Sequence, residues 1–155
     1  MATRLPRLRL DDQLCFALYA ATNAVTRAYK PLLGKLGLTY PQYLVMLVLW
    51  QDGATSPNDI ATRLQLGASA ITPLLDQLEK SGFVARARSS TDRRRLIVAA
   101  TPTGAALYDL AAVAQDAIVC RTGLSDTGLH ALRDELNAMV DRIAAFSGMP
   151  TNEPD

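Results

Sequence analysis

The sequence predicts a mainly helical α+β fold in which one small β-hairpin interrupts a series of helices. Apolar residues recur at steps of three and four over most of the 155 residues, which is the spacing of amphipathic helices. Two short segments, 83–88 and 96–100, are instead typical of strands. The chain is 49% hydrophobic and 20% charged, a composition that fills a core and excludes a disordered or low-complexity class.

The first helix is predicted over residues 11–30. Apolar side chains such as Leu14 and Leu18 recur there at helical steps, and the segment holds no glycine or proline. Because Pro31 has no amide hydrogen to donate, we expect the helix to end before it. A separate short helical turn over 32–35 would follow.

Two further helices are predicted from their start signals. Tyr40 is expected to be extended because it precedes Pro41, and an almost wholly apolar helix over 41–51 would lie at the centre of the fold. Ser56 has the chemistry of an N-cap for a short helix over 57–64 that begins with a proline.

The next predicted elements are a helix over 68–80 and a hairpin. Pro73 lies inside this helix at a cost of up to ~3 kcal/mol, which a start nearer Ala70 would reduce. Strands over 83–88 and 96–100 then pair across a polar, turn-like tip.

Two long helices complete the chain. Thr101 opens a helix over 102–122, and Ser125 caps a last helix whose apolar spacing continues from Leu129 to Phe146. A small core would leave the apolar surface of two such helices uncovered unless they pack against a partner. A second copy of the chain is the simplest partner.

The charge pattern and the lack of other signals narrow the class of protein. Residues 1–102 hold 13 Lys and Arg against 7 Asp and Glu, whereas residues 103–155 hold 3 against 8. The net positive charge of residues 1–102 favours a polyanion as the binding partner. No apolar run approaches the ~20 residues of a membrane span, so we expect a cytoplasmic protein without a membrane partner. A single histidine, His130, leaves no His-based metal site and no cofactor is expected.

Two short helices followed by a hairpin with a basic tip form the order of a winged helix-turn-helix. The helix over 68–80 would enter the major groove of double-stranded DNA, while the hairpin, or wing, would reach the minor groove or the phosphates. Ala68 and Ala70 offer no side-chain hydrogen bonds there. An arginine cluster can also be plain solvated surface. The candidate DNA contacts are Ser69, Thr72 and Gln77 on the helix, and Arg86, Asp92, Arg93, Arg94 and Arg95 in the wing.

Residues 56–103, with Asp92 and Arg94 in the wing, resemble the MarR family of dimeric winged-helix transcription regulators. The resemblance covers about residues 11–146. It implies that the wing arginine enters the minor groove, that the carboxylate orients it, and that the terminal helices form the dimer. The expected organisation is then a single domain over 1–155. Its parts are dimerisation helices over 11–36 and 102–146, a DNA-binding unit over 41–101 and a tail over 147–155.

Cys15 begins a second stripe on the first helix, which continues as Tyr19 and Tyr29. Tyrosine hydroxyls can stabilise a thiolate by donating hydrogen bonds, although an isolated cysteine is more often inert filling. Cys15 and Tyr29 are 14 residues apart, about 21 Å along a continuous helix. If both serve one thiol, the tyrosine must come from the partner subunit.

The set Cys15, Tyr29 and Tyr40 resembles the organic hydroperoxide-sensing repressors of this family, the OhrR group. The resemblance implies that Cys15 is the peroxide-reactive residue. Tyr19, one helical turn from Cys15 on the same chain, is expected to be a further support for the thiol. It also implies that Cys120 resolves the oxidised thiol through an intersubunit disulfide that releases the operator. Two alternatives stay open: a regulator with an inert Cys15 released by a small aromatic anion, and a thiol peroxidase. We expect no enzyme, since the arginine wing would go unused in a peroxidase.

Overall fold

The computed structural model describes residues 8–147. The basic residues Arg4 and Arg7 and almost all of the predicted tail over 147–155 lie outside the described residues. The contacts divide the chain into two compact units, the first reaching to Ile118 and the second starting at Val119. Within the described part, no helix is both long and apolar enough to cross a membrane.

The first helix is longer than predicted. A 3₁₀ turn, η1 (Leu10–Asp12), leads into α1 (Leu14–Gly34), and the expected end before Pro31 is wrong because the helix continues through this proline. Leu33, beyond the proline, is fully buried and Leu32 packs against the core. Burying one such side chain stabilises the fold by ~2 kcal/mol, which offsets much of the ~3 kcal/mol that an interior proline costs.

The central helix is α2 (Tyr40–Asp52), whose apolar side chains form much of the core, as its sequence predicts. Tyr40 is helical rather than extended, because Thr39 is the N-cap. Thr39 Oγ1 accepts the backbone N–H of Gln42 at 3.4 Å, and Gln42 Oε1 accepts the backbone N–H of Thr39 at 2.9 Å. This reciprocal capping box starts the helix one residue earlier than the proline alone indicates.

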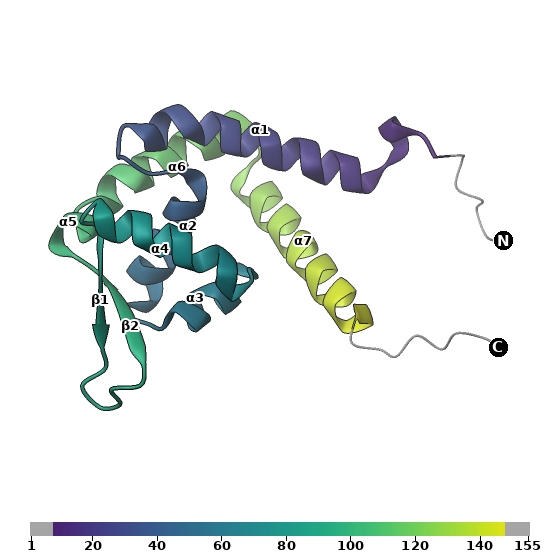
Figure 1. Ribbon diagram of the computed structural model, residues 1–155. Coiled ribbons are helices and arrows are strands. Elements are labelled where there is room, and N and C mark those ends of the chain that lie inside the picture. Colours follow the sequence, from purple (N-terminus) through teal and green to yellow (C-terminus); the bar gives the residue numbers. More distant parts are fainter. Residues whose placement is uncertain (1–7, 148–155) are drawn as a thin grey trace, which may run out of the picture. The chain divides into compact units, whose positions relative to one another are not determined.

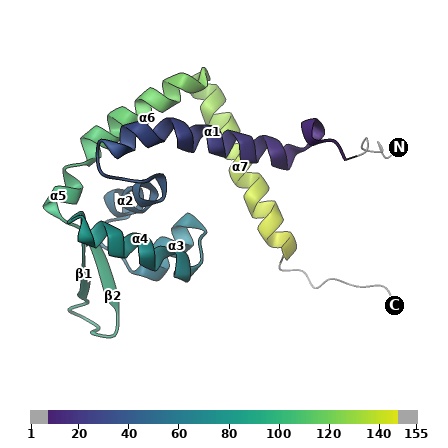
Figure 2. The ribbon, with the colours of Figure 1, turned by 45° about the horizontal axis from the view of Figure 1, so that its top comes forward.

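The helix-turn-helix consists of α3 (Pro57–Leu64) and α4 (Ala68–Lys80), and both ranges match the prediction. The hydroxyl of Ser56 caps α3, and Gln65 turns the chain after it with a left-handed φ of 55°. Because α4 begins where predicted, Pro73 lies inside the helix and the later start is wrong. Figures 1 and 2 show α3 and α4 side by side, next to α2.

The wing is the antiparallel pair β1 (Val84–Arg88) and β2 (Leu96–Ala100), with Arg86 opposite Val98. The first strand is one residue shorter than predicted. Thr55 and Val98 exchange two backbone hydrogen bonds of 3.0 and 2.8 Å. This bridge fixes the base of the wing to the loop before α3, while the tip projects away from the helices (Figure 1).

The helix predicted over 102–122 is two helices, α5 (Pro102–Ala105) and α6 (Tyr108–Thr122). Thr101 caps α5 as predicted, because its hydroxyl accepts the N–H of Gly104 at 3.1 Å. The prediction of one continuous helix is therefore wrong, although its predicted first and last residues are correct.

Tertiary contacts at Gly104 explain this break. Its carbonyl accepts a 3.2 Å hydrogen bond from Trp50 Nε1 as well as one from the N–H of Leu107. A Cβ at this position would overlap the carbonyl oxygen of Phe83. The backbone of Gly104 is thus held against α2 and the start of the wing at the point where the helix is interrupted.

The second unit contains α7 (Asp126–Ser147). Ser125 caps it as predicted, since its hydroxyl accepts the N–H of Gly128 at 3.2 Å. The large apolar side chains of α7 that stay exposed are Leu132, Ile143 and Phe146.

Candidate functional site

Helix α4 is the second helix of the helix-turn-helix and the predicted recognition helix. It turns three apolar residues into the core and leaves a polar side exposed. Ser69 and Thr72 are exposed, as a groove-contacting role requires, and so are Ala68 and Ala70. Gln77 is exposed too, but it differs from the other helix candidates because its Oε1 accepts a 2.9 Å hydrogen bond from Gln42 Nε2. Its amide oxygen is therefore engaged with α2.

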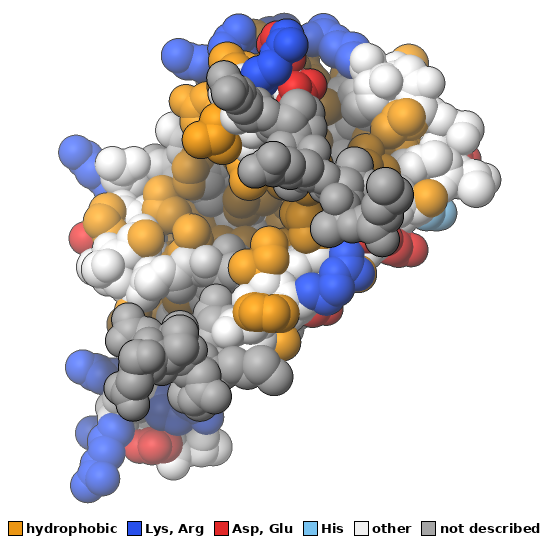
Figure 3. Space-filling model, turned by 90° about the vertical axis from the view of Figure 1, so that its right-hand side faces the viewer, with side chains coloured by type: hydrophobic (Ala, Val, Ile, Leu, Met, Phe, Trp, Pro, Cys, Tyr) orange, Lys and Arg blue, Asp and Glu red, His pale blue; other side chains and the backbone are white. Residues whose placement is uncertain are grey.

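The wing tip is a turn that Asp92 shapes through the backbone. Its Oδ1 accepts the N–H of Arg94 at 3.0 Å, and its carbonyl accepts the N–H of Arg95 at 2.9 Å. The carboxylate thus orients the arginine through the main chain. Arg93 and Arg94 are exposed and form no ion pair with residues 8–147. Figure 3 shows basic side chains gathered at this lower end of the molecule.

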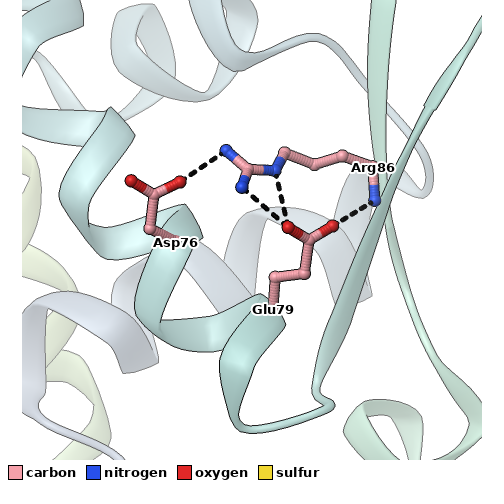
Figure 4. A network of polar contacts seen from close by, with 3 residues as sticks. All are labelled: Asp76, Glu79 and Arg86. Carbon is pink, nitrogen blue, oxygen red and sulfur yellow. Dashed lines mark hydrogen bonds and ion pairs between the residues drawn. The ribbon is translucent and has the colours of Figure 1, made fainter.

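Arg86 is bound to the recognition helix. Its Nη1 lies 2.7 Å from Asp76 Oδ1 and its Nη2 lies 2.7 Å from Glu79 Oε2, as Figure 4 shows. The hydrogen bond to Glu79 raises the pKa of the guanidinium, and the same contact lowers the pKa of the Glu79 carboxyl. Two carboxylates therefore compensate its charge, and it ties β1 to α4.

Two other arginines lie at the ends of the turn that forms the wing tip. Arg88 Nη1 donates a 3.2 Å hydrogen bond to the carbonyl of Arg94, and Arg95 Nη2 lies 3.9 Å from Asp59 Oδ2. A cleft of about 470 Å³ separates the first turn of α3 from the wing. Its lining residues are Ser56, Pro57, Asn58, Asp59, Arg94, Arg95 and Leu96. Asn58 was not predicted, although its place in the first turn of a capped helix before the wing could have indicated it.

Three tyrosines cluster where α1 meets α2. The ring of Tyr29 lies 5.3 Å from that of Tyr40 and 5.5 Å from that of Tyr43, between centroids. Burial is the main cause that raises the pKa of all three phenols above the ordinary value. The hydroxyl of Tyr43 donates a 3.3 Å hydrogen bond to Gln115 Oε1. Tyr29 and Tyr40, both predicted, are therefore together and remain protonated donors at neutral pH.

A cleft of about 590 Å³ opens beside Tyr40. It has a mixed lining: Asn23, Thr26, Arg27, Lys30, Gly34, Leu38, Thr39 and Tyr40. Arg27 and Lys30 were not predicted. Helical spacing would have placed both on one side of α1 with Gly34, had the helix been continued past Pro31.

Cys15 lies in the first turn of α1 and is exposed. Because α1 is continuous, about 21 Å separates it from Tyr29 along the helix axis, so the two do not meet within one chain. Tyr19, one turn from Cys15, is 66% exposed, and Leu14 is 63% exposed. The apolar side around the thiol thus has no cover from its own unit.

Cys120 lies near the end of α6, in the second unit, and is also exposed. Both cysteines are free thiols. His130 is an exposed residue of α7.

Comparison with known proteins gives a consistent result. The family model described as "MarR family" matches residues 38–96, which span α2 to the first residue of β2. The transcriptional regulator TtmR of Methylorubrum extorquens is 43% identical over 139 residues, 90% of this chain and 71% of that protein. The organic hydroperoxide resistance transcriptional regulator of Bacillus subtilis is 34% identical over 143 residues, 92% of this chain and 97% of that protein.

A solved structure supports the same comparison. Reduced AbfR, a protein of Staphylococcus epidermidis, bound to DNA superposes with a TM-score of 0.71 at 32% identity. The match covers 88% of this chain and 95% of that one.

Proposed function

This chain belongs to the MarR family of transcription regulators, and from that premise we propose that it is a homodimeric repressor released from DNA when an organic hydroperoxide oxidises Cys15. Its winged-helix fold and its relatives are those of regulators rather than of enzymes. The observation that carries the proposal is that an exposed Cys15 lies far along α1 from the paired rings of Tyr29 and Tyr40. One thiol can therefore meet both phenols only if they come from the partner subunit.

The DNA-binding side follows from the exposed groups of α4 and the wing. Ser69 and Thr72 contact base edges or phosphates in the major groove. The exposed guanidinium groups of Arg93 and Arg94 enter the adjacent minor groove or pair with phosphates. Two copies then read two half-sites about one helical turn of DNA apart.

The unpartnered apolar side chains support the homodimer. On α1, Leu14 and Tyr19 are more than half exposed, and on α6 Leu110 and Val113 are too. A soluble protein rarely leaves such surface uncovered, and a second copy covers it by a symmetric contact.

The sensor is completed across this interface. The partner subunit's Cys15 lies against the phenols of Tyr29 and Tyr40, and the partner's Tyr19, one helical turn from that cysteine, is a further donor. Burial raises the pKa of both phenols, so they stay protonated. Hydrogen bonds donated by neutral phenols stabilise a thiolate.

The oxidation proceeds in two balanced steps. The Cys15 thiolate attacks the distal oxygen of the hydroperoxide, which gives a sulfenic acid and an alkoxide that takes up a proton to become the alcohol. The thiol of Cys120 from the other subunit then condenses with the sulfenic acid, forming a disulfide and releasing water. A disulfide requires Cα atoms within about 6.8 Å, so its formation constrains the dimer and respaces the two recognition helices.

One observation favours a second candidate function. The cleft beside Tyr40 carries Arg27 and Lys30 in its lining, a combination that suits a small aromatic anion. In that case the anion would release the DNA and Cys15 would be inert.

Binding to the DNA upstream of the chain's own gene tests the proposal. Fluorescence anisotropy is measured with the reduced protein, after addition of an organic hydroperoxide, and with Cys15→Ser. We expect the reduced protein and the variant to bind alike and only the wild type to be released. Release of the variant by peroxide would disprove Cys15 as the sensor. Release of both by an aromatic carboxylate alone would favour the second candidate.

Cys120→Ser separates the two oxidation steps. This variant should still form a sulfenic acid at Cys15 but no intersubunit crosslink on a non-reducing gel. One equivalent of peroxide consumed per Cys15, without turnover, distinguishes a sensor from a peroxidase.

A further inference from the structure

Gln42 is the one polar side chain among residues 8–147 that is buried, with 6% of its surface exposed. It lies in the first turn of α2, two residues after Tyr40. A buried amide is costly unless its polar atoms are hydrogen-bonded. Its partners therefore indicate why an amide is present in an otherwise apolar core.

The amide of Gln42 joins two elements. Its Oε1 accepts the backbone N–H of Thr39 at 2.9 Å, and its Nε2 donates to Gln77 Oε1 at 2.9 Å. A backbone N–H can only donate, so the atom facing Thr39 is the oxygen and the NH₂ group must face Gln77. The orientation of both amides is thus fixed by the start of α2.

This bond connects the tyrosine site with the recognition helix. The turn that holds Gln42 also holds Tyr40, whose ring packs on Tyr29, and Thr39, which lines the cleft beside it. Gln77 is on α4. A displacement of the first turn of α2 therefore pulls directly on the helix that reads DNA, within one subunit.

We propose that Gln42 and Gln77 are positioning residues that couple the Tyr29–Tyr40 site to the recognition helix. Gln77 acts through Gln42 rather than by contacting a base. The proposal rests on the proposed function only for the signal that the hydrogen bond transmits, which is the oxidation of Cys15. The positioning of α4 by this bond does not depend on peroxide chemistry.

Operator binding by the reduced protein tests the positioning role. Gln77→Met should raise Kd about fivefold, as removal of one hydrogen bond would. Gln42→Met removes that bond and also the capping bond from the N–H of Thr39, so it should raise Kd at least as much. The double variant should raise Kd no further than Gln42→Met alone, because both changes remove the same Gln42–Gln77 hydrogen bond. An effect of the double variant equal to the product of the single effects would overturn the proposal.

Gln77→Glu distinguishes positioning from base contact. The carboxylate still accepts from Gln42 Nε2, so we expect Kd within about twofold of the wild type at ~0.15 M salt, where the added charge is screened over ~8 Å. A residue facing DNA would weaken binding far more, since a carboxylate repels phosphates. Weakening by Gln77→Glu as large as that by Gln77→Met would therefore overturn the proposal. Thermal unfolding of every variant verifies that it is folded.

Release by an organic hydroperoxide tests the coupling itself. In Gln77→Met the ratio of oxidised to reduced Kd should fall at least about threefold below that of the wild type, while the rate of Cys15 oxidation stays the same. An unchanged ratio would overturn the coupling. If the wild type is not released at all, the proposed function fails instead, and the measurements on the reduced protein alone decide the positioning role.

Discussion

Arg86 on the wing and Glu79 on the recognition helix are joined by three hydrogen bonds. The backbone N–H of Arg86 donates to Oε1 at 3.2 Å, and its Nε and Nη2 donate to Oε2 at 3.2 and 2.7 Å. A forked contact of this kind fixes direction as well as distance. Helix α4 and the wing are therefore held in one relative orientation.

Arg86→Lys should weaken operator binding about threefold to tenfold without changing its salt dependence. Lysine keeps the charge but cannot reproduce the forked geometry, so the wing loses its alignment while the same phosphates stay neutralised. Anisotropy titrations at several salt concentrations measure both quantities. A change in the slope of log Kobs against log[salt] would indicate that Arg86 contacts a phosphate, as its place in the sequence first indicated.

Arg94→Ala should behave in the opposite way. Its guanidinium has no ion-pair partner among residues 8–147, so it is available to DNA. The slope of log Kobs against log[salt] should decrease by about 0.9 for each phosphate that the variant no longer neutralises. Arg133→Ala, which removes an exposed arginine from α7, is the matched control and should leave the slope unchanged. Equal slopes for Arg94→Ala and the wild type would remove the wing tip from the interface.

Tyr40→Phe should slow the oxidation of Cys15. Removing the hydroxyl takes away one hydrogen bond to the thiolate, so the reacting form of the cysteine is less stabilised. The rate of peroxide consumption, measured at several pH values, shows the effect. Tyr108→Phe, at an exposed tyrosine that packs on Trp50, serves as the control. Identical pH profiles for Tyr40→Phe and the wild type would contradict the sensor assigned to this site.

Local chemistry is what made much of the fold predictable. Ser56, Thr101 and Ser125 each cap a helix through a hydrogen bond to a residue three positions later. Such signals are contained in a few neighbouring residues. The two largest errors, the helix end at Pro31 and the unbroken helix through Gly104, occurred where distant contacts decide. Burial of Leu33 carries the helix past the first, and Trp50 and Phe83 hold the second.

The site was predictable in its residue types but not in their engagement. Cys15 is exposed and the ring of Tyr29 packs on that of Tyr40, while the sensing roles assigned to these residues stay predictions. Periodicity could not reveal that Arg86 is compensated, because its two carboxylates lie on a different element. Periodicity also could not reveal the role of Gln42. That role depends on a hydrogen bond to Gln77 on α4, which is distant in the sequence.

Gly104→Ala should destabilise the fold by about 3 kcal/mol, as overpacking against backbone does. The added methyl group would overlap the carbonyl of Phe83, which is main chain and cannot rotate away. Urea unfolding followed by the fluorescence of Trp50 measures the destabilisation, because the indole N–H of Trp50 is hydrogen-bonded to the carbonyl of Gly104 in the folded chain. Gly34→Ala, at a glycine with open space around its Cβ position, is the control and should cost far less.

Tyr29 should make the fold sensitive to alkali. Burial first, and the neighbouring Tyr43 second, raise its pKa in the folded chain, so the folded state holds the phenolic proton more tightly than the unfolded state. Its contribution to the free energy of unfolding is therefore complete below pH ~10, the ordinary pKa of a phenol, and decreases as the pH rises above that value. Tyr29→Phe removes the titrating group and keeps the ring, so its stability should fall less steeply between pH ~10 and ~12. Urea unfolding across that range measures both slopes, and parallel curves would show that the phenol of Tyr29 ionises as freely in the folded chain as in the unfolded one.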